Sequence, residues 1–127
     1  MVASSYEYID ALMSLAQNNE FLSTRGMDIL RTHYLAPDYT ISPARLSHHL
    51  FIDDIEKTMF YYDQLAEAIA HELDYTPIEE FDGHPMWLFT LCTVSDVPSI
   101  SQGGYYEFIL RPELVVALNQ LKWFGIH

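Results

Sequence analysis

Basic residues, glycine and cysteine are scarce in this sequence of 127 residues. Six Lys and Arg against eighteen Asp and Glu give a formal net charge of −12 and a pI near 4.6. Because phosphate contacts need positive side chains, this balance argues against direct binding of nucleic acid or of an anionic membrane. The one cysteine, Cys92, excludes an intrachain disulfide and fits a reducing compartment. Its apolar neighbours predict a buried, inert thiol.

Long hydrophobic runs, low-complexity segments and internal repeats are also missing. The apolar stretches are too short to cross a bilayer, and residues 1–10 have neither the basic residues nor the apolar core of a signal peptide. We therefore expect a cytoplasmic protein with no membrane partner. Half of the residues are hydrophobic, which is too many for a disordered acidic tail. At this length we expect a single domain over residues 1–127.

Local signals predict helices in the first part of the chain. Ser4 and Glu7 form a capping-box pattern, which begins a helix that runs to about residue 18. Ser23 or Thr24 caps a second helix. This helix must end before Pro37, because proline disfavours helical backbone at the residue that precedes it.

Two further helices follow. After a short connection at residues 38–41, Ser42 and Pro43 supply a hydroxyl N-cap and a proline at the first helical position of a short third helix. Asp53 or Asp54 caps a fourth, longer helix.

The fourth helix carries two neighbouring stripes of side chains, both with helical spacing. One stripe is apolar and predicts the core face: Ile55, Met59, Tyr62, Ala66, Ile69 and Leu73. The adjoining stripe carries four carboxylates: Glu56, Phe60, Asp63, Glu67, Ala70 and Asp74.

The second half of the chain changes character. Residues 86–94 are rich in aromatic and β-branched side chains and predict a strand. Residues 95–104 contain a proline and two glycines and predict a long turn, which leads to a second, antiparallel strand at residues 105–110. Arg111 and Pro112 begin a last helix.

The predicted fold class is α+β and mostly helical, with four helices, a two-stranded antiparallel ribbon and a C-terminal helix. A short helix, a longer helix and then a ribbon is the order of a winged helix-turn-helix, although such an arrangement by itself carries no function. The ribbon has aromatic residues on both faces. One face should cover the core, and the other could pair two copies as a homodimer.

Negative charge is concentrated between residues 53 and 82. This segment holds ten acids and one base, a net charge of −9, while the other residues hold eight acids and five bases, a net charge of −3. Such a segment is either a solvated face that maintains solubility or a surface complementary to a basic partner. Carboxylates along a helix can imitate the phosphates of a duplex, as in small acidic inhibitors of the anti-defence or immunity type.

We therefore predict a non-enzymatic, acidic protein-interaction module that inhibits a basic nucleic-acid-binding enzyme. Aromatic side chains beside charges are typical of interface anchors, so Phe60 belongs to the predicted surface. The predicted partner-binding residues are Asp53, Asp54, Glu56, Phe60, Asp63, Glu67, Asp74, Glu79 and Glu80.

The alternative is a DNA-binding accessory domain with winged helix-turn-helix topology. Base readout favours Arg, Lys, Asn and Gln, and on the long helix only Lys57 and Gln64 qualify. The predicted ribbon contains no Lys or Arg, so direct nucleic-acid binding is the weaker interpretation. The candidate contacts of this alternative are Arg45, His48, His49 and Lys57.

Signatures of catalysis are missing. The sequence has no P-loop, dinucleotide fingerprint, nucleophile elbow or pair of Cys motifs. Glu67, His71 and Asp74 are better explained as a solvated face than as a weak metal site. We therefore expect no catalytic residue, no cofactor and no metal. A small enzyme of another type would need a concave pocket with perturbed titratable groups, for example around His33 or His84.

Segments in two parts of the chain, from MDILRTHYLAP to ARL at residues 27–46 and from WLFTL to Trp123 at residues 87–123, resemble a known family. It is a helical accessory module that accompanies HNH nuclease domains in bacterial proteins and also occurs in small stand-alone relatives of unknown function. The resemblance covers roughly residues 27–124. It implies a recognition-type module, and no catalytic residue carries over, because the finger arrangement of the nuclease is absent. The long helix, expected to be polar or basic in that module, is acidic here. The similar stretches are MDILRTHYLAP at residues 27–37, TIS at 40–42, ARL at 44–46, WLFTL at 87–91, LRPEL at 110–114, AL at 117–118 and Trp123.

Overall fold

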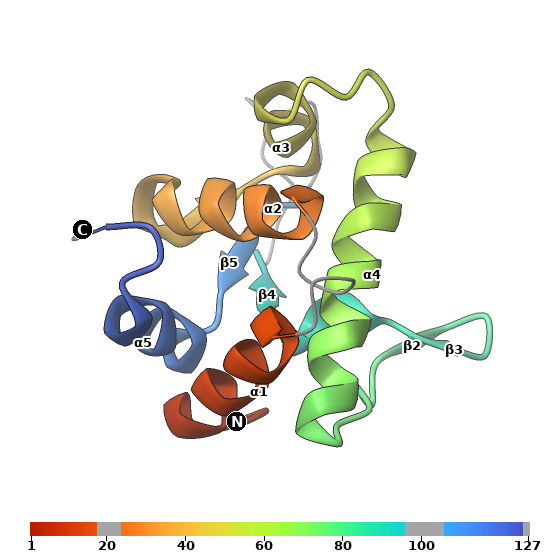
Figure 1. The fold of residues 1–127 in the computed structure, drawn as a ribbon. Helices are drawn as coiled ribbons and strands as arrows, with labels where there is room; N and C mark the ends of the chain where they lie inside the picture. Colours follow the sequence, from red (N-terminus) through yellow and green to blue (C-terminus); the bar gives the residue numbers. More distant parts are fainter. Residues whose placement is uncertain (18–23, 96–105, 126–127) are drawn as a thin grey trace.

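The computed structural model describes residues 1–17, 24–95 and 106–125 (Figure 1). Within these residues, α-helices and short antiparallel strands are combined, which confirms the predicted α+β class. The α-helices are α1 (Ser5–Gln17), α2 (Thr24–Leu35), α3 (Pro43–His49), α4 (Ile55–Leu73) and α5 (Pro112–Leu121). The strands are β1 (Thr40–Ile41), β2 (Glu80–Phe81), β3 (His84–Pro85), β4 (Cys92–Val94) and β5 (Phe108–Leu110). Two 3₁₀ helices are η1 (Pro37–Tyr39) and η2 (Trp87–Thr90).

Side-chain caps begin α1 and α3 where the sequence predicts them. The Ser4 N–H donates to Glu7 Oε1 at 2.9 Å, and the Glu7 N–H donates to Ser4 Oγ at 3.2 Å. Before α3, the Arg45 N–H donates to Ser42 Oγ at 3.2 Å, and Pro43 occupies the first turn. These bonds satisfy backbone donors that a helix start leaves without partners.

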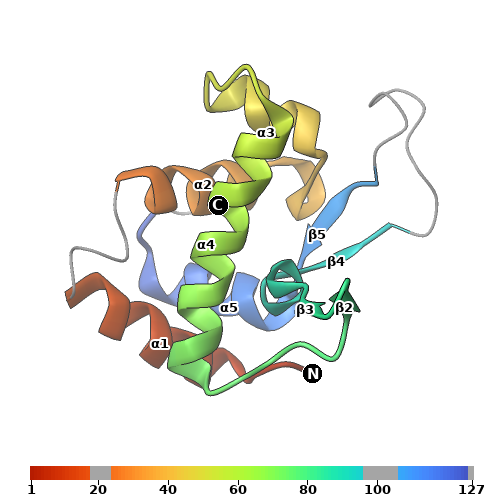
Figure 2. The same cartoon turned by 90° about the vertical axis from the view of Figure 1, so that its right-hand side faces the viewer.

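Helix α4 is capped by Asp54 and not by Asp53. The Asp54 Oδ1 accepts the Glu56 N–H at 2.9 Å and the Lys57 N–H at 3.3 Å. At the other end, Asp74 adopts a left-handed conformation with φ 54° and ends the helix. Figure 2 shows α4 running along the molecule from α3 to α1.

The core face of α4 is wider than the predicted stripe. Tyr62, Ala66 and Ile69 are buried as predicted, but Leu65 and Ala70 are buried as well. Ala70 therefore belongs to the core although it lies on the adjoining stripe that carries the carboxylates. The reason is that α4 packs against α1, α2, α3 and η2, so it is covered on more than one side.

The predicted strand at residues 86–94 was wrong over its first half, which forms η2. Only β4 (Cys92–Val94) is extended. Leu88 and Leu91 are buried three residues apart, which is the period of a 3₁₀ helix, and η2 packs against α4. Trp87 and Phe89 lie on η2, so the interpretation of an aromatic ribbon with a second face for a homodimer does not hold for these residues.

Within the described residues, the sheet has three strands in the order β1-β5-β4, and not the predicted two. The antiparallel pairing of β4 with β5 is confirmed, with Thr93 opposite Ile109. The third strand, β1, lies within residues 38–41, where the sequence predicted a simple connection; Thr40 is also opposite Ile109, on the other side of β5. The predicted strand over 105–110 is shorter, and the predicted turn at 95–104 lies outside the described residues except for Ser95.

A second sheet, the hairpin β2–β3, was not predicted. Phe81 pairs with His84 across a two-residue turn, Asp82-Gly83, in which φ is 54° and 78°. Asp-Gly favours this turn, because both positions need positive φ. The hairpin projects from the body beside α4 (Figure 1).

His33 is a core residue, held by polar groups from α4 and β5. Its Nε2 lies 2.9 Å from the Phe108 carbonyl oxygen, and its Nδ1 lies 3.0 Å from the Tyr62 hydroxyl. Since a carbonyl can only accept, Nε2 carries the proton and Nδ1 accepts from the hydroxyl. Burial lowers the pKa of His33 to about 4, so the ring is neutral near pH 7.

Candidate functional site

Three of the predicted partner-binding residues lie around the start of α4. Asp53, Asp54 and Glu56 are all exposed. The Asp54 carboxylate is occupied by the helix cap, whereas Asp53 and Glu56 make no hydrogen bond or ion pair within the described part of the chain. Two carboxylates are therefore available to a partner at this end.

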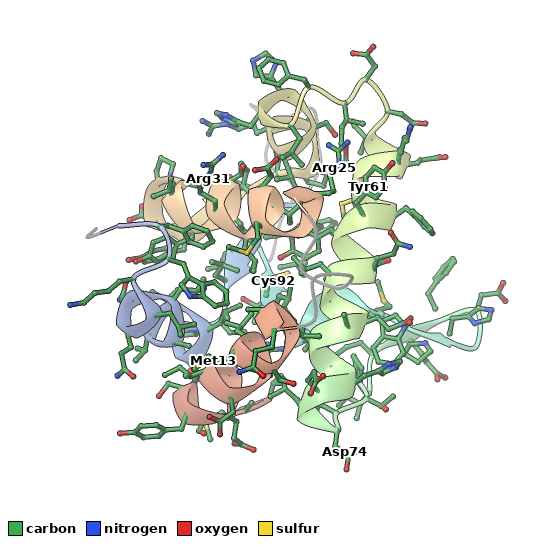
Figure 3. All side chains as sticks on the ribbon, in the orientation of Figure 1. Met13, Arg25, Arg31, Tyr61, Asp74 and Cys92 are labelled. Carbon is green, nitrogen blue, oxygen red and sulfur yellow. The ribbon has the colours of Figure 1, made fainter. Side chains whose placement is uncertain are left out.

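Phe60 is the exposed aromatic side chain of α4. Its exposed fraction is 59%, which suits a contact anchor. The neighbouring Tyr61 is half-buried, and the Arg25 guanidinium of α2 lies 4.9 Å from the centre of its ring. Figure 3 shows Arg25 and Tyr61 at the junction of α2 and α4. Tyr61 is therefore engaged within the molecule, while Phe60 remains available.

Asp63 occupies an unusual environment in the middle of α4. Its Oδ1 atom is buried and has no hydrogen-bond partner within the described residues. Burial raises the pKa of the carboxyl above its ordinary value; the backbone N–H of Leu88 acts in the opposite direction, and Glu67 raises the pKa further. A buried carboxylate oxygen without a donor is costly and marks a candidate functional position.

A pocket adjoins Asp63, between α4 and the hairpin β2–β3. Its volume is about 320 Å³. Asp63, Asp82 and His84 supply its titratable groups, and Phe81, at 75% exposure, supplies an aromatic wall. Sequence reasoning missed this pocket, because it depends on the hairpin; the Asp82-Gly83 pair was the signal that could have predicted it.

The remaining predicted residues do not form one continuous surface with those at the start of α4. Glu80 is exposed on β2, and Glu79 is half-buried with an Oε1 atom that has no hydrogen-bond partner within the described residues. Asp74 projects from the far end of α4 (Figure 3). At 1.5 Å per residue, Asp54 and Asp74 are about 30 Å apart. Of the nine predicted residues, only Asp63 lines the pocket. The others are spread from the start of α4 to β2: Asp53, Asp54 and Glu56 at the start of α4, Phe60 and Glu67 along it, Asp74 at its end, and Glu79 and Glu80 at β2.

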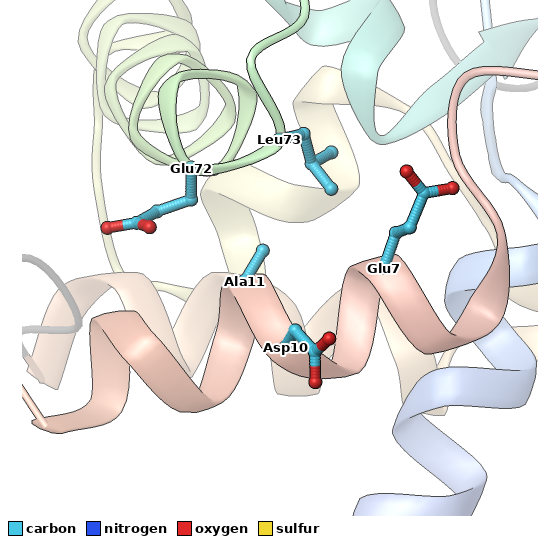
Figure 4. Close-up of a pocket in the computed structure, with 5 residues that line it drawn as sticks. All are labelled: Glu7, Asp10, Ala11, Glu72 and Leu73. Atoms are coloured by element: carbon cyan, nitrogen blue, oxygen red, sulfur yellow. The ribbon is translucent and has the colours of Figure 1, made fainter.

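A second acidic hollow lies between α1 and the end of α4, and its residues were not predicted. It has a volume of about 250 Å³. Glu7, Asp10 and Ala11 of α1 and Glu72 and Leu73 of α4 line it (Figure 4). In the sequence, Glu7 is fully explained as the partner of Ser4 in the helix cap. Nothing there indicates that Glu7 also lines a hollow. This hollow extends the negative surface but contains no buried carboxylate without a partner.

The residues of the DNA-binding alternative lie on α3 and at the start of α4. Arg45, His48 and His49 are exposed on α3, and Lys57 is exposed in the first turn of α4. On α4, Lys57 stands next to Glu56, so the exposed start of this helix is not positive.

Cys92 is buried, as the apolar neighbours predict. Burial raises the pKa of its thiol to about 12, and the sulfur donates to the Leu88 carbonyl oxygen at 3.4 Å. The described residues include no group of three or more His, Cys, Asp or Glu side chains that could hold a metal ion. Neither His33 nor Cys92 faces the pocket beside Asp63.

No protein-family model, curated protein or solved structure matches this chain. Across the described residues, no helix combines the length and the apolar character needed to cross a membrane. A carboxylate with an orphaned oxygen, a second carboxylate and an exposed aromatic ring form a suitable receptor for a guanidinium or ammonium group.

Proposed function

We propose that this chain is a non-enzymatic, acidic protein-interaction module that inhibits a basic nucleic-acid-binding enzyme. The partner would dock on the surface formed by α4 and the hairpin β2–β3, within residues 53–82. The observation that carries the proposal is the buried Asp63 oxygen without a partner at the wall of the pocket. An arginine or lysine side chain of the partner would enter this pocket and pair with the Asp63 carboxylate.

The charge distribution supports a basic partner. Residues 53–82 hold a net charge of −9, and such a surface steers a positively charged partner during association. Exposed carboxylates of Asp53, Glu56 and Glu80 would act mainly on the association rate. Phe60 and Phe81, both exposed, would supply apolar contact area around the charged groups.

A capture experiment tests the proposal. Tagged wild-type, Asp63→Asn and Asp38→Asn chains are used to retain proteins from nuclease-treated extract of the native host. Asp38→Asn is the matched control, because it removes the same charge at an exposed residue outside the segment. We expect a basic nucleic-acid-binding enzyme to be retained at low salt and lost at high salt. Asp63→Asn should reduce its retention about tenfold, and Asp38→Asn should not.

A second measurement addresses the pocket directly. Acetylarginine amide is titrated into the full chain and amide NMR spectra are recorded. The resonances of residues 81–88 should shift in the wild type and much less in Asp63→Asn. Equal responses of the two chains, or capture of nucleic acid without a protein partner, would overturn the proposal.

The pocket also favours a second candidate function, acid–base catalysis by a small enzyme. Asp63, whose pKa is raised, and His84 line the same pocket. Acid–base catalysis requires such titratable groups in one concave site. The described lining contains no serine, threonine, cysteine or lysine that could act as a nucleophile. Cation binding is therefore the better-supported use of the pocket. His84→Gln separates the two, because it should leave capture of a basic partner within about twofold but abolish acid–base catalysis.

The winged-helix interpretation and the resemblance to an HNH-associated module remain proposals about architecture. In their favour, the short helix α3 precedes the longer α4, and a hairpin follows. Against a DNA-binding role, the hairpin β2–β3 carries Glu80 and Asp82 and no Lys or Arg. Glu67→Lys distinguishes the roles: it should weaken binding of a basic protein but leave or improve binding of DNA.

A further inference from the structure

A third pocket, between α2 and α3, has the opposite electrostatic character from the surface proposed above. Its volume is about 340 Å³, within the range of small-molecule sites. Arg31 of α2 and Arg45 and His49 of α3 line it. The two helices pack against each other, which brings these side chains to one hollow although up to eighteen positions separate them in sequence (Figure 1).

The local charge is exceptional for this chain. Residues 24–49 contain three arginines and two acids, a net charge of +1, whereas the rest of the chain contains three bases and sixteen acids, a net charge of −13. None of the residues that line the pocket is acidic. Two of the six Lys and Arg residues of the whole chain therefore line a single hollow, with a histidine beside them.

The two arginines differ in how they are engaged. The Arg31 guanidinium lies 3.3 Å from the Asp28 carboxylate on the same helix. The two side chains are 57% and 39% exposed, so this ion pair is weak and can be exchanged for another anion. Figure 3 shows the place of Arg31 on α2. Arg45 is exposed and makes no hydrogen bond or ion pair through its side chain within the described residues. A guanidinium of this kind presents a fork of donors that matches a phosphate.

The remaining walls are apolar. Leu35 and Ala36 come from the end of α2, Pro37 from η1 and Ile41 from β1. Phosphate alone would leave most of a 340 Å³ hollow unfilled. The pocket therefore suits a ligand that combines an anionic group with an apolar or aromatic body of about the size of a mononucleotide.

We propose that the hollow between α2 and α3 binds a phosphate monoester carried on an apolar or aromatic body, with Arg31, Arg45 and His49 holding the phosphate. The apolar walls formed by Leu35, Pro37 and Ile41 contact the body of the ligand. This site is separate from the acidic surface. It lies between α2 and α3, whereas the acidic surface lies on α4 and the hairpin β2–β3, and its charged side chains are positive. The same phosphate chemistry occurs in a free mononucleotide and at the phosphorylated end of a nucleic-acid strand.

The test uses the full chain and amide NMR spectra, with adenosine monophosphate as the probe. We expect saturable shifts at Arg31, Arg45 and His49, with inorganic phosphate giving weaker binding and adenosine giving none at the same concentration. Arg45→Gln should weaken the binding of adenosine monophosphate about tenfold. Lys122→Gln is the matched control, since it removes one positive charge from an exposed residue outside the pocket, and it should change the affinity less than about twofold.

An oligonucleotide with a terminal phosphate, compared with the same strand ending in a hydroxyl, distinguishes the two sources of the phosphate. Tighter binding of the phosphorylated strand than of the mononucleotide assigns the site to strand ends; the reverse order assigns it to a free small molecule. The proposal is overturned if no probe gives saturable shifts up to about 10 mM. It is also overturned if the shifts lie elsewhere, if adenosine binds equally well, or if Arg45→Gln binds like the wild type.

Discussion

At the scale of single residues, buried polar side chains connect elements that are far apart in sequence. His33 bridges Tyr62 of α4 and Phe108 of β5 through its two ring nitrogens. Burial also raises the pKa of Tyr62, so this hydroxyl stays protonated and continues to donate to His33. The pair is therefore stable only while the histidine ring is neutral.

This arrangement makes the free energy of unfolding depend on pH. The pKa of His33 is about 4 in the folded chain, against an ordinary value of 6.5, so the unfolded chain binds a proton first as the pH falls. The contribution of His33 is thus fully present above pH 6.5 and is lost between pH 6.5 and about 4. The loss should reach about 3 kcal/mol.

Urea unfolding at a series of pH values measures this effect. His33→Gln keeps a polar side chain at the site but has no group that titrates in this window. It should be less stable than the wild type near neutral pH, and its stability should decline less as the pH falls. Carboxylates titrate in both proteins, so the difference between the two curves isolates His33. Parallel curves would contradict the prediction.

At the scale of elements, the ends of helices are set by local sequence. The start of α4 allows a helix-capping aspartate to be compared with an adjacent aspartate that does not cap. Asp53 and Asp54 are adjacent, both exposed and equal in charge. Only Asp54 accepts the N–H groups of Glu56 and Lys57. The two residues therefore separate the contribution of a cap from that of a negative charge.

Asp54→Ala should lower the free energy of unfolding by about 1 kcal/mol, because two backbone donors at the start of α4 lose their acceptor. Asp53→Ala removes the same charge and should have a much smaller effect. Chemical denaturation of the two variants and the wild type measures the difference. Equal destabilisation by both substitutions would show that charge, and not capping, stabilises this end of α4.

Other elements depend on tertiary contacts. The aromatic run at residues 87–90 has the composition of a strand, yet it forms η2, because packing Leu88 and Leu91 towards α4 requires a three-residue period. The two-residue strand β1 likewise depends on a distant segment, because it is a strand only through its antiparallel pairing with β5. Neither could be predicted from residue types alone.

At the scale of the whole molecule, the N-terminal helix is attached to the second half of the chain by a buried hydrogen bond. The Tyr8 hydroxyl of α1 donates to the Thr90 carbonyl oxygen of η2 at 2.6 Å. Helix α1 also packs against α4 and α5. The first helix therefore contributes to the stability of elements that follow it by about eighty positions.

Tyr8→Phe tests this long-range contact. Removing the hydroxyl leaves a buried carbonyl without its donor, which should lower the free energy of unfolding by about 1–3 kcal/mol. Tyr6→Phe is the matched control, since Tyr6 is on the same helix but exposed, and it should be nearly neutral. Thermal or urea unfolding of both variants gives the comparison. A Tyr8→Phe protein as stable as the wild type would contradict the role given to this bond.

Much of the helical framework could be predicted from the sequence, because its determinants are close neighbours. The cap at Ser4, the stop before Pro37 and the start of α3 at Ser42 each depend on residues within one helical turn. Exposure of Phe60 and burial of Tyr62 also follow from spacing along α4. The concentration of acids between residues 53 and 82 is likewise a property of the sequence alone.

The two candidate sites were decided by the tertiary structure. Asp63 lies on the predicted stripe of carboxylates, but the pocket that it lines is completed by residues of the hairpin β2–β3 and η2, about twenty positions further along the chain. Burial raises the pKa of its carboxyl. Arg31 becomes the neighbour of Arg45 only because α2 and α3 pack together. The physical reason is the same in both cases: helix caps and helix spacing are set by bonds within a few residues, whereas desolvation and charge clustering depend on which distant segments the core brings together.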